Sequence, residues 1–234
     1  ARVVMPHGEF GNQLIRTRAG VLAITHDVRT AGLVTSRDGG RTWEGAQFAE
    51  RDTDLRPGAT GRRPPGIHSP IAELDDGRLM AFTRQDAEED QARFHGRMPV
   101  SHSADGGRTW TFAESEFPAI STVQRPVLLR LREGPLLLCS YTDQSRDGRN
   151  RRGMTFRAAD GSTFTGYGLF AAVSLDEGRT WPHRRLVTPG DPARERPSID
   201  RAVATFSGTR SERCGYLAAV QTRDGNIQLL SSRN

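Results

Sequence analysis

Apolar and branched residues recur along this chain in pairs of short runs, and a polar turn that contains glycine separates the two runs of each pair. Two such runs around a tight turn are typical of a β-hairpin. The pattern occurs in four segments: residues 12–27, 68–84, 125–141 and 215–233. The aligned turn glycines are Gly20, Gly77, Gly134 and Gly225. We therefore predict four hairpins.

Three of the hairpins are followed by a third apolar run that ends in an eight-residue motif. The copies read SRDGGRTW at 36–43, SADGGRTW at 103–110 and SLDEGRTW at 174–181, so all fit S-x-D-x-G-x-T-W. In this octet, Ser and Asp can bind nearby backbone amides, Gly supplies a positive φ, and Thr-Trp begins a new strand. Each copy shares only one carboxylate, whereas calcium takes roughly six to eight oxygen ligands. The octet is therefore predicted to be a structural turn.

A hairpin, a third strand, an octet turn and a fourth strand make a four-stranded unit, which is typical of a propeller blade. We expect blades around residues 1–55, 56–120 and 121–190 and a partial blade at 191–234, all within one β-propeller domain spanning 1–234. Since a propeller closes on itself, this domain is expected to continue in a longer chain. The connections between second and third strands are the longest, and binding residues concentrate in such loops.

Composition narrows the classes of partner. All 33 basic residues are arginine, the net charge is +5, and the basic clusters at 62–63, 149–152 and 184–185 fall in predicted loops without interleaved aromatic residues. This pattern argues against a nucleic-acid partner and suits a small acidic substrate. No apolar run approaches the roughly 20 residues that a membrane-spanning helix needs.

Motifs for metals and cofactors are missing from the sequence. The 6 histidines show no HxH or HExxH spacing, no cysteine pair has zinc spacing, and no nucleophile elbow or nucleotide-binding loop occurs. We therefore expect no metal and no cofactor. Cys139 and Cys214 are expected to be buried free thiols, with a disulfide between them as the alternative.

The octets, with phrases such as GLFAAVSLDEGRTWP and GYLAAVQTRDGNIQLLSSR, resemble the Asp boxes of the sialidase (neuraminidase) superfamily, and of its bacterial BNR-repeat members in particular. The resemblance implies a six-bladed β-propeller, of which this chain covers roughly three and a half blades. It also implies a secreted or periplasmic exo-acting glycoside hydrolase that releases a terminal acidic or polar sugar from a glycan. Two other interpretations stay open, a non-catalytic glycan-binding propeller and a scaffold for protein partners. The oligomeric state is left open.

The resemblance also suggests site residues. Sialidases combine a Tyr nucleophile assisted by Glu, an acid/base Asp on a loop, and three arginines that clamp the sugar carboxylate, a task that suits the guanidinium fork. His68 stands where the first clamp arginine would open a strand in the second blade, whereas Arg125 keeps the arginine in the third. Arg84 ends a second strand and precedes an acidic loop with Asp86 and Asp90.

From these matches we expect two groups of site residues. The catalytic candidates are His68, Asp86 and Asp90. The substrate-binding candidates are Arg84, Arg97, Arg125 and Arg201. The starts of first strands and the connections between second and third strands lie at one end of the blades, so these groups are expected to converge at the propeller axis, with the octets on the outer rim. The ordinary alternatives are a solvated acidic loop, surface arginines and a structural histidine. None of the three tyrosines lies in a convincing nucleophile context, and the family's Tyr is expected beyond residue 234.

Overall fold

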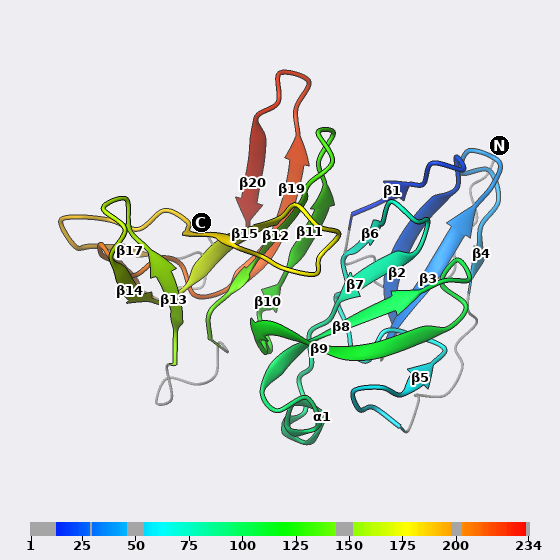
Figure 1. Ribbon diagram of the computed structural model, residues 1–234, viewed down its shortest axis with the longest axis horizontal. Coiled ribbons are helices and arrows are strands. Elements are labelled where there is room, and N and C mark those ends of the chain that lie inside the picture. Colours follow the sequence, from blue (N-terminus) through cyan, green and yellow to red (C-terminus); the bar gives the residue numbers. More distant parts are fainter. Residues whose placement is uncertain (1–12, 29, 46–53, 144–151, 198–202, 233–234) are drawn as a thin grey trace. The chain divides into compact units, whose positions relative to one another are not determined.

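The fold is a β-propeller of mostly antiparallel sheets, seen in a computed structural model that describes residues 13–28, 30–45, 54–143, 152–197 and 203–232 (Figure 1). The chain divides into two compact units, residues 1–116 and 117–234, and each is described by itself. Among the described residues, no helix is long and apolar enough to span a membrane. Whether residues 1–234 form one domain stays a prediction.

The first unit holds two sheets. One has the order β1-β2-β3-β4, with bounds Ile15–Arg16, Leu22–Val28, Thr30–Ser36 and Glu44–Gly45. The other has the order β5-β9-β8-β7-β6, with bounds Thr60–Gly61, Trp110–Pro118, Arg97–Ser103, Leu79–Phe82 and Ile71–Glu73. A short helix, α1 (Glu88–Arg93), connects β7 to β8. In each sheet the four strands of the predicted blade, β1 to β4 and β6 to β9, pair in sequence order. The short strand β5 adds to the second sheet beside β9.

The second unit repeats this order once and adds further hairpins. One sheet has the order β11-β12-β15-β16, with bounds Val127–Arg130, Leu136–Tyr141, Leu169–Ser174 and His183–Leu186. The other has the order β10-β19-β20, with bounds Gln124–Arg125, Gly215–Gln221 and Ile227–Ser231. Two separate hairpins pair β13 with β14 and β17 with β18, with bounds Met154–Arg157, Thr163–Gly166, Arg194–Pro197 and Val203–Phe206.

The four predicted hairpins are confirmed, and so is the role of their glycines. They are the pairs β1–β2, β6–β7, β11–β12 and β19–β20. The φ angles of the turn glycines are +80° at Gly20, +84° at Gly77, +107° at Gly134 and +91° at Gly225. A side chain in this left-handed region is strained, which is why glycine occupies these turns.

The octet turns satisfy their own polar groups, as predicted. In the second copy, one oxygen of Asp105 accepts from the hydroxyl of Ser103 at 2.8 Å and from the backbone N–H groups of Arg108 and Thr109 at 3.0 and 2.9 Å. Its other oxygen accepts from the Thr109 hydroxyl at 2.7 Å. The first copy, around Asp38, repeats these contacts. The carboxylate is thus an internal acceptor of the turn.

The tryptophan of the second octet packs between the two sheets of the first unit. Trp110 is fully buried, and its indole N–H donates to the Gly107 carbonyl at 3.0 Å. The same core cluster takes side chains from both sheets: Ala23, Leu33, Leu55, Ala59, Ile71, Leu79, Ala81, Phe94 and Phe112. In the second unit, Trp181 meets the Phe117 ring edge-on at 5.5 Å. The tryptophans of the second and third octets therefore fill the cores of their units.

Some expectations need correction or refinement. The acidic stretch after Arg84, expected to be a loop through Asp90, is a loop only as far as residue 87; α1 begins at Glu88, and its first turn contains Glu88, Glu89 and Asp90. Carboxylates in the first turn are favoured by the positive end of the helix dipole, and the side chain of Gln91 anchors the helix to the Gln85 carbonyl. Cys139 and Cys214 are both buried free thiols, as expected.

Candidate functional site

The segments before β6 and after β7 meet at one end of the second sheet. Ile67 and Arg84 exchange two backbone hydrogen bonds of 3.0 Å, and the side-chain amide of Gln85 donates to the Pro65 carbonyl at 2.9 Å. These contacts fix His68, at the start of the first strand, and Arg84, at the end of the second, on the same edge. The hairpin turns and octets lie at the opposite end of these antiparallel strands.

Arg84 is a buried cation with a carboxylate on its solvent side. Its side chain is 5% exposed, and its Nη2 lies 2.9 Å from Oδ2 of Asp86, which is 38% exposed. The backbone on this edge is held further by Gln91 of α1, whose amide donates to the Gln85 carbonyl at 2.6 Å. A guanidinium that is anchored in this way is suited to bind an incoming anion.

His68 lies against the first sheet. Its ring Nδ1 is 2.6 Å from Oδ2 of Asp27, a residue of β2, and both side chains are buried. Its backbone N–H lies 3.1 and 3.0 Å from the two oxygens of the same carboxylate. The φ of His68 is +52°, a left-handed conformation that a residue with a side chain seldom adopts. The carboxylate of Asp27 thus accepts from the backbone N–H of His68 and also lies close to its ring.

Two more buried polar residues accompany this pair, His26 and Arg63, which are 3% and 5% exposed. Burial lowers the pKa of His26; the nearby Asp27 raises this pKa and Arg63 lowers it. Several polar or charged residues are therefore buried at this end of the first unit, at a cost that proteins often bear at functional sites. Sequence reasoning missed Asp27, His26 and Arg63. The one signal was a His-Asp pair at the end of an otherwise apolar strand.

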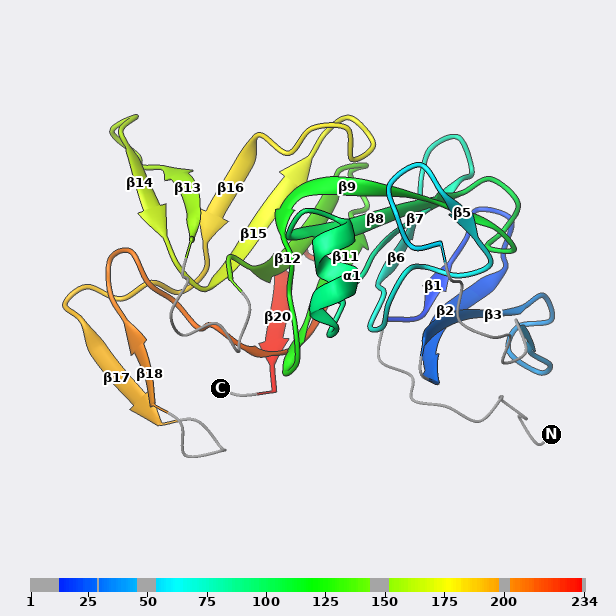
Figure 2. The ribbon, with the colours of Figure 1, turned by 90° about the horizontal axis from the view of Figure 1, so that it is seen from below.

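The other site candidates lie in different surroundings. Asp90 is buried in α1, 3.4 Å from Nη1 of Arg93. Arg97 is exposed, and its guanidinium donates to the Glu116 carbonyl at 3.1 Å. Figure 2 shows β8, which begins at Arg97, between the ribbons of β7 and β9. The first unit therefore brings His68, Arg84 and Asp86 to one edge, whereas the side chain of Arg97 contacts the neighbouring strand β9.

The second unit contains Arg125, and Arg201 lies outside the described residues. Arg125 is half-buried at the start of a blade, and its guanidinium carbon lies 5.0 Å from the centre of the Tyr216 ring. Stacking of this kind leaves the edge of a guanidinium able to form hydrogen bonds. Convergence of Arg125 with His68 and Arg84 stays a prediction because each unit is described by itself.

Tyr141 carries a hydroxyl with a structural role. It is fully buried, and its hydroxyl donates to the Gly215 carbonyl at 2.8 Å. Burial raises the pKa of Tyr141 well above its usual value, and the carboxylate of Glu212 raises it further. The phenol therefore stays protonated and is a poor nucleophile.

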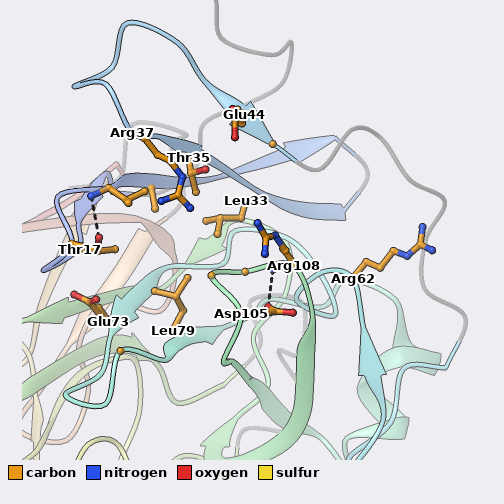
Figure 3. Close-up of a pocket in the computed structure, with 17 residues that line it drawn as sticks. Thr17, Leu33, Thr35, Arg37, Glu44, Arg62, Glu73, Leu79, Asp105 and Arg108 are labelled. Carbon is orange, nitrogen blue, oxygen red and sulfur yellow. Dashed lines mark hydrogen bonds between the residues drawn. The ribbon is translucent and has the colours of Figure 1, made fainter.

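The first unit also has a cavity of about 640 Å³ at the octet end of its strands (Figure 3). Figure 3 shows Leu33 and Leu79 in its wall and the side chain of Arg62 pointing away. Arginines and carboxylates both line it, and the carboxylate of Asp105 is already occupied by the octet turn. The cavity thus shows no single preferred charge. Among the described residues, no group of three or more His, Cys, Asp or Glu is placed to hold a metal ion.

No protein-family model matches this sequence, and no curated protein matches it. Solved structures do match. The NanB sialidase from Streptococcus pneumoniae is 14% identical over 94% of this chain and 27% of its own, with a TM-score of 0.55. An intramolecular trans-sialidase from Ruminococcus gnavus is 15% identical over 95% of this chain and 37% of its own, with a TM-score of 0.47. An α-L-arabinanase from Cellvibrio cellulosa is 11% identical over 93% of this chain and 75% of its own, with a TM-score of 0.41.

The match to NanB shows that the fold is similar to that of a sialidase propeller. An identity of 14% supports the fold alone, because one fold hosts many activities. This chain spans 27% of the length of NanB and 37% of the trans-sialidase.

Proposed function

We propose that this chain carries part of the active site of a sialidase-type exo-glycoside hydrolase, which releases a terminal acidic sugar from a glycan. The ion pair between Arg84 and Asp86 is the observation that carries the proposal. A buried guanidinium beside a partly exposed carboxylate offers an anion-binding group and an acid/base group at adjacent positions. The sialidase-like fold supports this assignment, and the octets are interpreted as Asp boxes of the BNR type.

Each candidate has a proposed task. Arg84 binds the sugar carboxylate, and Asp86 donates a proton to the oxygen of the leaving group and later takes a proton from water. We assign this task to Asp86 rather than Asp90, because Asp90 is buried in α1 and faces Arg93. His68 replaces a clamp arginine and hydrogen-bonds the sugar.

Three other arginines would complete the binding of the carboxylate. Arg125 is the strongest of these, because the Tyr216 ring orients its guanidinium. Arg97 and Arg201 are kept as further candidates. A clamp of several guanidinium groups would hold its charge at any physiological pH, since arginine does not lose its proton there.

A panel of aryl glycosides that includes an aryl sialoside tests the function. We expect release of the aryl group from the acidic glycoside, and we expect Asp86→Asn to lower kcat by about 10²-fold or more through loss of proton transfer. Asp54→Asn is the control, because Asp54 is an exposed carboxylate that is also paired with a nearby arginine, Arg56, at 2.8 Å.

Two other results would replace the proposal. Sugar binding that depends on Arg84, without hydrolysis of any glycoside, would make the chain a glycan-binding propeller. Absence of both binding and hydrolysis across the panel would favour a scaffold for protein partners.

A further inference from the structure

We propose that the cavity of about 640 Å³ at the octet end of the first unit is a second binding site, for a small organic acid with an apolar body and a hydroxyl group. Side chains from both sheets of this unit line it (Figure 3). Its volume falls in the range of roughly 300 to 1,000 Å³ that is typical of small-molecule sites. None of the described candidate site residues at the other end of the strands lines this cavity, so the proposal does not rest on the proposed function.

The inner wall of the cavity is apolar. Ala23 of β2, Leu33 of β3 and Leu79 of β7 contribute to it, and all three belong to the core cluster between the sheets. The turns that border the cavity leave space, because a Cβ added at Gly77 or Gly106 would meet nothing within 4 Å. An apolar ligand body that enters here leaves water and gains contact with these side chains, which favours binding.

Arg108, in the second octet, is not bonded to its own turn through its side chain. The same octet position is Arg41 in the first copy and Arg179 in the third. There the guanidinium donates to the carbonyl of the octet aspartate, from Arg41 to Asp38 at 3.5 Å and from Arg179 to Asp176 at 2.9 Å. Within the described chain the guanidinium of Arg108 makes no such bond, and the residue lines the cavity instead. The octet turn therefore leaves this cation available to a ligand.

Arg37 supplies a second cation, from the first octet. The second octet position is arginine here but Ala104 and Leu175 in the other copies, so the turn itself does not require an arginine. Arg37 is exposed, and its side chain has no ion pair or hydrogen bond among the described residues. In Figure 3 the side chains of Arg37 and Arg108 extend from the two walls toward the space beside Leu33. Two guanidinium groups from two octets therefore border one cavity.

Two of the three carboxylates in the lining are already engaged. Asp105 accepts hydrogen bonds inside its own turn, and Oε2 of Glu73 accepts from the backbone N–H of Arg18 at 2.7 Å. Glu44 of β4 pairs in register with Thr35, and its carboxylate has no hydrogen bond or ion pair within the described part of the chain. Two guanidinium groups thus stand against one carboxylate, which favours an anionic ligand and leaves Glu44 as an acceptor for a ligand hydroxyl.

These features define the class of ligand and the probe. Guanidinium forks bind a carboxylate through charge-assisted hydrogen bonds and keep their charge at any physiological pH. 6-Hydroxy-2-naphthoate has a flat apolar body with a carboxylate at one end and a hydroxyl at the other. The carboxamide of the same compound keeps this shape without the negative charge, so the pair of compounds isolates the contribution of the anion.

Four variants test the assignment. Arg108→Gln and Arg37→Gln each remove one guanidinium. Arg41→Gln is the matched control, because Arg41 holds the octet position of Arg108 but does not line the cavity. Thr35→Phe places a ring on the cavity side of β3 and fills the space without changing any charge.

Calorimetric titration measures the affinity, and ¹H–¹⁵N spectra locate the probe. We expect saturable binding of the naphthoate to the parent, with shifts of the Thr35 and Gly106 amides. Binding of the carboxamide to the parent, and of the naphthoate to Arg108→Gln and Arg37→Gln, should be about 10-fold weaker, because each lacks a charge-assisted contact. Arg41→Gln should bind like the parent and Thr35→Phe should lose binding, with all four variants melting within a few degrees of the parent.

Other results would overturn the proposal. These are no saturable binding to the parent up to about 1 mM, equal affinity for the carboxamide, and equal weakening in Arg41→Gln. Amide shifts at Arg84 in place of Thr35 would move the ligand to the other end of the strands and would also overturn it. If Thr35→Phe fails to fold, the comparison of the two matched arginine variants still decides. Hydrolysis of aryl glycosides is measured separately, and its absence would remove the proposed function while leaving this site in place.

Discussion

Asp105 shows how one residue stabilises an octet turn and makes this stabilisation depend on pH. Partial burial raises the pKa of Asp105, but hydrogen bonds from Thr109, Ser103 and Arg108 outweigh it, and the pKa falls from 3.8 to about 2. Because the folded pKa is lower than the unfolded one, the contribution to stability is complete above about pH 4 and is lost as the pH falls toward 2.

We therefore predict that Asp105→Ala lowers the free energy of unfolding by about 1 to 2 kcal/mol at pH 7, and that the difference from the parent shrinks between pH 4 and pH 2. Urea unfolding at several pH values measures both effects. The affinity for a glycan ligand is expected to stay unchanged. A pH-independent difference would mean that the ionised carboxylate is not what stabilises the turn.

Gly107 and Gly77 separate backbone strain from a steric clash. Both have a left-handed backbone, with φ of +89° and +84°. A Cβ at Gly77 would meet nothing within 4 Å, whereas a Cβ at Gly107 would lie 2.1 Å from Cδ2 of Leu33 in the neighbouring sheet. Gly107 thus permits the octet turn to pack against the first blade.

We predict that Gly77→Ala costs about 1 kcal/mol, through backbone strain alone, and that Gly107→Ala costs roughly 1 to 3 kcal/mol more. Adding Leu33→Ala to Gly107→Ala should recover part of this extra cost, as a double-mutant cycle of unfolding free energies would show. Equal costs for the two glycine variants would contradict the close packing of Leu33.

At the scale of whole elements, the hairpins and third strands could be predicted because their signals are local. The alternation of apolar runs and the turn glycines give β6–β7 and β11–β12 directly from the sequence. The helix α1 was missed because six residues are too few to establish a helical period. The pairing of β10 with β19 was missed because it joins residues about 90 positions apart, which no local pattern records.

In the candidate site, too, the residues with local sequence signals could be predicted and those joined by long-range contacts could not. Arg84 and Asp86 are neighbours in the sequence, so one strand end predicted both. The contact between Asp27 and His68 joins two sheets, and Arg63 is buried from a segment that looked like a basic loop. Only tertiary packing brings such groups together, so the sequence could indicate the edge that holds the site but not its buried carboxylate.

The octet tryptophans are predicted to stabilise the contact between sheets in proportion to their burial. Trp110 and Trp43 occupy the same motif position and each donates its indole N–H to a carbonyl of its own turn, but only Trp110 is fully buried. Trp110→Ala is expected to cost roughly 3 to 5 kcal/mol through the cavity it leaves, and Trp43→Ala clearly less. Thermal or urea unfolding compares the two. Similar losses would mean that inter-sheet packing is not what Trp110 contributes.

At the scale of the whole molecule, the question is whether groups from the two compact units bind one ligand. Arg84 belongs to the first unit and follows the end of its second strand, β7. Arg125 belongs to the second unit and precedes the first strand of its blade, β11. In a propeller such positions lie at the same end of successive blades. If the two guanidinium groups share one sugar carboxylate, then each depends on the other to hold it.

A double-mutant cycle tests this arrangement. We predict that Arg125→Ala weakens binding of an anionic sugar by about 1.5 to 3 kcal/mol, because a charge-assisted contact is lost. Arg84→Ala should weaken binding similarly. The loss of binding free energy in the double variant should differ from the sum of the two single losses by about 0.5 kcal/mol or more, as it does for residues that share a ligand.

Arg132→Ala is the control, since its guanidinium binds the carbonyls of Thr222 and Arg223 at the turn end of its blade. Calorimetric titration of the four proteins with sialic acid gives the coupling. Strict additivity would place Arg84 and Arg125 in separate sites, and unchanged affinity in Arg125→Ala would remove the second unit from the binding of the carboxylate.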